Sequence, residues 1–333
     1  MARRRPIIQT RRRRAARSVS HAPRTDPMTP GPGPIPLPRH LAVGTLILIS
    51  TIFSANHVAA RVAFDDGAGV LLGVTCRAGA SLLALLGIVL WRRQGLGLPT
   101  RLGAWQGLLG LLIALQSFCL YSAVARIPVA LALLINSLFP LLFALLTWAL
   151  GGPRPTRRAS LLMGLILTGL ALVLDLPGLL GNGAAPDARW AAGVALAFGS
   201  ASLFAGALWV TEHKLAALPG PVRSLYTILI VFCAMLAAGA ADFMPGGMRP
   251  PDGLAGWAAL AVLSLCYTTG FCTLFILMPR LDMPRNAPVM NAEPVASLAL
   301  GWLILDQAFD DRQLLGGLVV LTCIVVLAYS RRR

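Results

Sequence analysis

Ten long apolar segments, separated by short polar gaps, follow one another between residues 41 and 330 of this 333-residue chain. Each is roughly 17 to 25 residues long, which is the length that an α-helix needs to cross about 30 Å of hydrocarbon. Only 13% of the residues are charged, too few to cover a soluble protein of this size. The sequence therefore predicts an all-α polytopic membrane protein with ten transmembrane helices, at residues 41–59, 69–91, 103–122, 127–150, 159–175, 190–211, 223–241, 254–278, 286–305 and 313–330.

The positive charges are distributed unevenly between the two sides that these helices define. If the N-terminus is inside, the inner tails and loops hold 23 of the 29 Lys and Arg residues, the five outer loops hold one each, and Arg77 lies in a helix. Positively charged loops stay in the cytoplasm. We therefore expect a multi-pass protein of the cell membrane (inner or plasma membrane) with both termini cytoplasmic. The formal charge of +16 then reflects topology, and we expect no nucleic-acid partner.

Residues 1–39 precede the first apolar segment and combine ten basic residues with a proline-rich stretch. Such a segment cannot bury enough apolar surface to fold, so we expect a disordered cytoplasmic tail. An organelle transit peptide, or a true start at Met28, is the alternative for this tail. Beyond it we expect a first five-helix repeat at 40–176, a second at 188–330, and a basic cytoplasmic C-terminus at 331–333.

The two halves of the chain repeat each other at a nearly constant spacing. Three residue types recur 154 residues apart: Arg126 with Arg280, Pro140 with Pro294, and Trp148 with Trp302. Because each half has five predicted spans, the second copy enters the membrane from the opposite side, and the fold is expected to consist of two inverted repeats. Inverted repeats are the architecture of alternating-access carriers. A chance match in a Leu- and Ala-rich background is the alternative.

Three stretches resemble the EamA-type, ten-transmembrane-helix branch of the drug/metabolite transporter (DMT) superfamily. The sequence FSANHVAAR at 53–61 is similar to the family's WGSNFVAxK/R and keeps Asn56, with His57 where Phe is usual. CRA at 76–78 resembles the family's RxxxA segment. NAEPVA at 291–296, with GW at 301–302 and QLLGG at 313–317, is similar to LEPVxAxxxGWxxLGExLxxxQxxGxxLI. The resemblance covers 41–330 and implies a transporter.

Two charged side chains lie well inside predicted helices. Arg77 and Glu293 each cost about 2.5 to 3.5 kcal/mol at a helix centre, so each should face the protein interior and have a partner. Their depths differ by only some 6 Å across the hydrocarbon, so they can pair directly or share an anionic substrate. We expect Arg77 to bind a substrate carboxylate. Glu293 would carry the coupling proton, because burial disfavours its charged form. A salt bridge without a transport role is the alternative.

The other candidate residues of the substrate pathway are prolines, asparagines, a histidine and tyrosines. Pro140 and Pro294 occupy equivalent places in the two halves, where each would remove a backbone hydrogen bond and free a carbonyl in mid-membrane, as paired interruptions at a binding site do; an ordinary helix kink is the alternative. Asn136 and Asn291 lie within a turn of these prolines and could hydrogen-bond a substrate. The remaining candidates are Asn56, His57, Tyr121 and Tyr267. Each has a structural alternative, such as packing or a bond between helices.

These features predict a secondary active transporter that exports a small metabolite or amino-acid-like solute in exchange for protons by alternating access. Its expected partners are the substrate, protons and the lipid bilayer, and a homodimer stays open. Uptake or exchange of another metabolite, such as a nucleotide sugar, is an alternative, and so is a channel. A membrane-embedded enzyme would need a nucleophile with its base, or a metal site. With four His, no HExxH motif and six Cys that form no CxxC pair, we expect no enzymatic activity, metal or cofactor.

Overall fold

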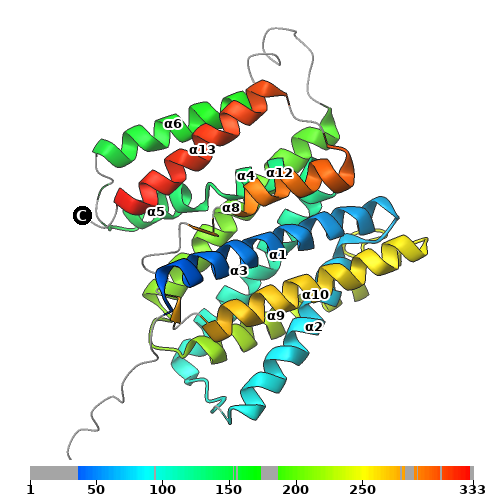
Figure 1. Cartoon of the computed structure of the whole chain (residues 1–333). Helices are drawn as coiled ribbons and strands as arrows, with labels where there is room; N and C mark the ends of the chain where they lie inside the picture. Colours follow the sequence, from blue (N-terminus) through cyan, green and yellow to red (C-terminus); the bar gives the residue numbers. More distant parts are fainter. Residues whose placement is uncertain are drawn as a thin grey trace, which may run out of the picture. The chain divides into compact units, whose positions relative to one another are not determined.

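The computed structural model describes residues 37–93, 95–152, 154, 157–173, 187–277, 280–281, 289–290, 292–307 and 310–330, and it contains no strand among them. The predicted tail at 1–39, apart from its last three residues, and the C-terminus at 331–333 lie outside this part. The helices are α1 (Arg39–Asp65), α2 (Val70–Trp91), α3 (Thr100–Val124), α4 (Val129–Asn136), α5 (Phe139–Ala149), α6 (Arg157–Val173), α8 (Ala188–His213), α9 (Gly220–Ala240), α10 (Leu254–Leu277), α12 (Ala292–Leu305) and α13 (Asp311–Ser330) (Figure 1).

Seven stretches of the described chain are long and apolar enough to cross a membrane. They are α1, α2, α3, α4 with α5 taken as one span, α8, α9 and α10. Shorter apolar helices lie at Ala292–Leu305 and Leu314–Cys323. These lengths agree with the polytopic membrane protein expected from the sequence, and the total of ten spans stays a prediction.

Prolines mark the start of several helices in the described residues. α1, α3, α4 and α9 each begin directly after a proline, namely Pro38, Pro99, Pro128 and Pro219. The proline ring fixes φ near −65°, and the missing N–H costs little at a helix start, where the first N–H groups have no partner within the helix. The local sequence thus sets where these helices begin.

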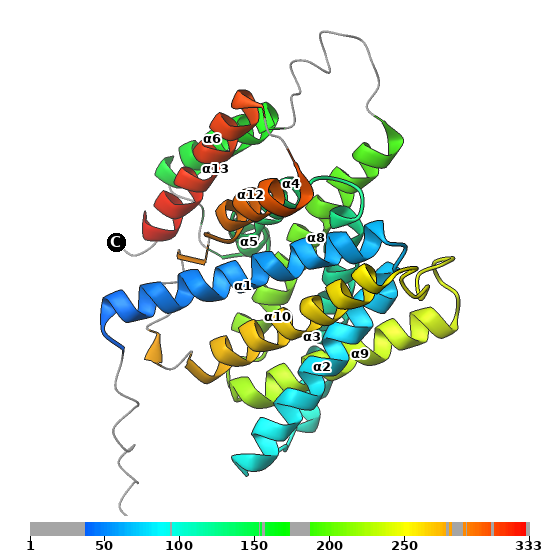
Figure 2. The same cartoon turned by 45° about the vertical axis from the view of Figure 1, so that its right-hand side comes forward.

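The main helix contacts join the first half of the sequence to the second. α1 packs along α10, α3 along α8, α2 on α9, and α6 on α13 (Figures 1 and 2). α1 also contacts α12, and α8 contacts both α4 and α5. α9 approaches α3 closely because residue 110 is a glycine: a Cβ there would lie 2.6 Å from the side chain of Ile230.

The fourth predicted span is interrupted and forms two helices. α4 ends at Asn136 and α5 begins at Phe139, with two turn residues between them. Pro140 lies in the first turn of α5, where a proline is well tolerated. In the second half α12 begins at Ala292, 153 residues after Phe139, so Pro294 also lies in a first turn. Each proline thus lies in the first turn of a helix, and the fourth span is interrupted just before Pro140.

Candidate functional site

Six of the residues predicted from the sequence lie together, contributed by five helices. We call this group the central cluster. α1 provides two members, and α2, α3, α10 and α12 provide one each: Asn56, His57, Arg77, Tyr121, Tyr267 and Glu293.

Arg77 is a buried cation held between two aromatic rings. The side chain is 4% exposed, and its Cζ lies 4.5 Å from the ring centroid of Tyr121 and 4.0 Å from that of Tyr267. Its guanidinium forms no salt bridge with any described residue, and its Nε has no hydrogen-bond partner there. Two cation–π contacts of about 1 to 2 kcal/mol each offset the cost of burying the charge. Its N–H donors remain available to a carboxylate.

Glu293 pairs with His57. Its Oε1 lies 3.3 Å from His57 Nε2, and the two side chains are 23% and 8% exposed. Among the described residues no other basic side chain lies within salt-bridge distance of Glu293, so the direct Arg77–Glu293 pair considered from the sequence is wrong. Glu293 also lies in the first turn of α12, where the helix dipole stabilises a carboxylate.

Serines extend the polar contact between α1 and α12. Ser54 Oγ and Ser297 Oγ are 2.7 Å apart, and Ser297 Oγ also donates to the Glu293 carbonyl at 3.0 Å. Ser50 Oγ lies 3.4 Å from the Met290 carbonyl. The serines were not among the predicted site residues, although Ser50, Ser54 and His57 follow a helical spacing that puts them on one face of α1.

Asn56 fixes the position of Tyr121. The Tyr121 hydroxyl donates to Asn56 Oδ1 at 2.5 Å, and Asn56 Nδ2 donates to the Leu263 carbonyl at 2.9 Å. Both side chains are fully buried. The ring held in this way contacts Arg77 on its face, and its centroid lies 5.3 Å from that of His57. Asn56 thus supports the wall of the central cluster.

Asn136 belongs to a second polar group, which joins α3, α4 and α8. Its Oδ1 accepts a hydrogen bond from Ser200 Oγ at 2.8 Å, and that hydroxyl accepts one from Gln116 Nε2 at 3.0 Å. Ser200 and Gln116 were not predicted as site residues. Asn291, the other asparagine predicted near a proline, lies outside the described residues.

The place that corresponds to Glu293 in the first half holds an aromatic contact. Position 139 is 154 residues before position 293, and Phe139 of α5 packs edge-on against Phe204 of α8 with ring centroids 4.8 Å apart. The α5–α8 contact is therefore apolar here, whereas the α1–α12 contact contains a titratable pair.

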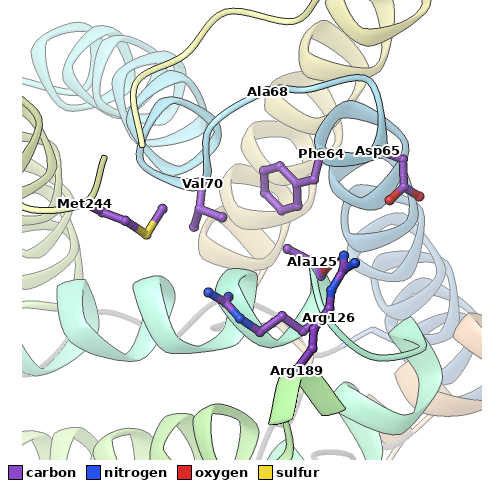
Figure 3. Close-up of a pocket in the computed structure, with 8 residues that line it drawn as sticks. All are labelled: Phe64, Asp65, Ala68, Val70, Ala125, Arg126, Arg189 and Met244. Carbon is purple, nitrogen blue, oxygen red and sulfur yellow. Dashed lines mark hydrogen bonds between the residues drawn. The ribbon is translucent and has the colours of Figure 1, made fainter. Parts of the chain in front are cut away.

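A pocket of about 400 Å³ lies where α1 and α3 end and α2 and α8 begin (Figure 3). We call it the outer pocket, because the predicted orientation puts these helix ends outside. The ring of Phe64, in its lining, contacts Tyr121 edge-on with centroids 6.2 Å apart, so one aromatic contact links the pocket to the central cluster. The lining consists of Phe64, Asp65, Ala68, Val70, Ala125, Arg126, Arg189 and Met244.

Comparison with known proteins assigns the chain to a family. Seventeen chains of solved structures match it. One, described as "Crystal structure of protein", is 22% identical, covers 89% of this chain and 100% of its own, and has a TM-score of 0.57. This likeness shows the fold alone. No curated protein matches. The sequence profile of the EamA-like transporter family matches twice, at residues 40–175 and 191–329, which is well over half of the chain. The chain belongs to the EamA-like transporter family, as its motifs suggested.

Proposed function

We propose that this protein is a secondary active transporter that exports a small acidic or amino-acid-like metabolite in exchange for protons. Membership of the family makes it a membrane transporter of the DMT type. The observation that carries the finer proposal is the central cluster, where a buried cation without a carboxylate partner lies beside a titratable pair.

Arg77 supports the binding of an acidic group. A guanidinium presents its N–H donors as a planar fork that matches a carboxylate. The substrate carboxylate would give this buried charge the ionic partner that the described residues do not provide. Tyr121 and Tyr267 would hold the guanidinium in place while the substrate exchanges. The site therefore favours anions and zwitterions over cations.

The His57–Glu293 pair supports proton coupling. It joins α1, in the first half of the chain, to α12, in the second. An imidazolium and a carboxylate 3.3 Å apart would attract each other strongly at the reduced dielectric of a protein, and protonation of the carboxylate would remove that attraction. We propose that the proton is bound by the Glu293 carboxylate and that its binding loosens the contact between α1 and α12.

The arrangement of the helices supports alternating access between two related halves. In the predicted repeat, α1 corresponds to α8 and α3 corresponds to α10. The repeat therefore pairs the α1–α10 contact with the α3–α8 contact, and the structure contains both. α5 and α12 begin 153 residues apart, and the fourth span is interrupted just before α5. Interrupted segments are a pointer to a transport site. With five spans in each half, we propose an inverted repeat with both termini in the cytoplasm.

Metabolite profiling of cells with and without the gene would identify the exported solute, and its flux in proteoliposomes would test the mechanism. Glu293→Gln can still accept a hydrogen bond from His57 but cannot titrate. We expect this variant to lose flux driven by a pH gradient and to keep counterflow exchange, which moves no net proton. Glu212→Gln, at an exposed glutamate of α8, is the matched control and should behave as the wild type. An unchanged metabolite profile would refute export, and wild-type gradient-driven flux in Glu293→Gln would refute the coupling role.

A further inference from the structure

We infer that the outer pocket is a second binding site, for the carboxylate or phosphate group of a small anionic solute. The inference rests on the proposed function, because the ligand would be the transported solute before or after it occupies the central cluster. It adds a site at the end of the helices, distinct from Arg77, where the solute is held at the predicted outer surface.

The lining of the outer pocket carries an excess of positive charge. The side chains of Arg126 and Arg189 form part of its wall (Figure 3), and neither makes a salt bridge with a described residue. The one carboxylate of the lining, Asp65, is already paired, since its Oδ2 lies 2.8 Å from Arg61 Nε. A concave space of about 400 Å³ has the size of a small-molecule site. Two cations in its wall raise the local concentration of anions.

Backbone carbonyls hold both guanidinium groups in position. Arg126 Nη1 donates to the Ser122 carbonyl at 2.7 Å, and Arg189 Nη2 donates to the Ala125 carbonyl at 3.0 Å. A guanidinium has five N–H donors, so each arginine keeps further donors for a ligand. A fixed guanidinium loses less conformational entropy when it binds an anion. Each guanidinium is thus oriented by one backbone carbonyl and presents its remaining donors to a ligand.

Three arginines converge on the end of α3. The carbonyls at a helix C-terminus attract cations, and Arg61 donates to the Val124 and Ile127 carbonyls at 3.0 and 3.3 Å. Arg126 and Arg189 donate to two other carbonyls of this end, so each arginine uses only part of its donors for the cap. The remaining donors of Arg126 and Arg189 are the ones that an anionic ligand would use.

A chain of side-chain contacts links the outer pocket to Arg77. Phe64 belongs to its lining and contacts Tyr121, and the other contacts of Tyr121 include Arg77 on its ring face. The rings of Phe64 and Tyr121 therefore lie between the lining of the outer pocket and Arg77. A solute released from Arg77 toward the pocket would pass from one guanidinium to two others, which keeps its charge compensated.

The test measures anion binding by the purified full-length protein in detergent, with acetate and inorganic phosphate as separate probes against chloride at constant ionic strength. Thermal unfolding gives the affinity, and Arg77→Gln isolates the outer pocket from the central cluster. In that background we expect saturable stabilisation by one or both probes, and the stronger probe identifies the group. Adding Arg126→Gln and Arg189→Gln should weaken this binding about tenfold or more.

Arg249→Gln is the matched control, because Arg249 is predicted to lie on the same side but is paired with Asp252 at 2.8 Å. It should bind as the parent does. If the glutamine variants do not fold, Arg126→Lys with Arg189→Lys keeps the charge, and weakened binding there still supports the inference. If Arg77→Gln alone loses all saturable binding, the outer site is refuted and the proposed binding role of Arg77 is supported. Binding that Arg77→Gln leaves wholly unchanged, and that Arg126→Gln and Arg189→Gln abolish, supports the outer site and contradicts the role of Arg77.

Discussion

Replacing Arg77 by methionine separates its role in binding from any role in folding. The change removes cation–π contacts at 4.5 and 4.0 Å, worth about 1 to 2 kcal/mol each when desolvated, or about 2 to 4 kcal/mol together. It also removes the cost of a charge within a membrane helix, about 2.5 to 3.5 kcal/mol. The two effects nearly cancel, so the free energy of unfolding of Arg77→Met should stay within about 1.5 kcal/mol of the wild type.

The assay compares membrane abundance, thermal unfolding in detergent and transport of the exported solute. We expect Arg77→Met to be abundant and folded but inactive, because an apolar side chain cannot bind the substrate carboxylate. Arg77→Lys keeps the charge without the planar fork and should bind more weakly. Arg249→Met is the matched control, since Arg249 lies outside the central cluster and pairs with Asp252 at 2.8 Å, and it should transport normally.

Two outcomes would contradict this reasoning. A loss of more than about 3 kcal/mol of stability in Arg77→Met would mean that the guanidinium completes a bonded network, as when one partner of a buried pair is removed. Wild-type transport by the folded Arg77→Met variant would remove Arg77 from the substrate site.

Three further predictions concern stability and topology. Tyr121→Phe leaves Asn56 Oδ1 buried without its donor, so unfolding measurements should show a loss of about 1 to 3 kcal/mol, and none would mean that the bond is not formed. Asp66 accepts hydrogen bonds from the backbone N–H groups of Gly253 and Gly256 at 2.8 and 3.1 Å. Asp66→Ala should therefore cost about 1 to 2 kcal/mol, most of which Asp66→Asn should restore. Accessibility labelling should find tags at both termini inside and a tag at 242–253 outside, and an external terminus would overturn the orientation.

The positions of the helices follow closely from the sequence, because a membrane requires long apolar segments and fixes their length. The segment predicted at 103–122, for example, is α3 at Thr100–Val124. The break between α4 and α5 lies where the sequence predicted an interruption, but the sequence does not give its form. The presence of Pro140 indicates that a helix cannot run undisturbed through this point, but it does not distinguish a kink from a helix that ends and starts again. Contacts with neighbouring helices decide between the two.

The members of the central cluster could be predicted from the sequence, but their partners could not. A charge in an apolar segment needs a partner, and this rule singles out Arg77 and Glu293. Position along a segment gives the depth of a side chain in the membrane, whereas pairing also depends on its direction around the helix axis. Depth alone therefore pairs Glu293 with Arg77, while the rotation of α1 brings His57 to it. The spacing of Ser50, Ser54 and His57 contains this information about direction.

The contrast between the His57–Glu293 pair and the Phe139–Phe204 contact has a thermodynamic consequence. If the two halves exchange conformations, opening the α1–α12 contact separates the His57–Glu293 pair, whereas opening the α5–α8 contact separates only two aromatic rings. Inward-facing and outward-facing states would then bind protons with different affinities. For a single proton held by one state alone, the ratio of the two states changes about tenfold per pH unit. The pH on the two sides of the membrane would thus determine whether the empty transporter is mainly inward-facing or mainly outward-facing, before any solute is bound.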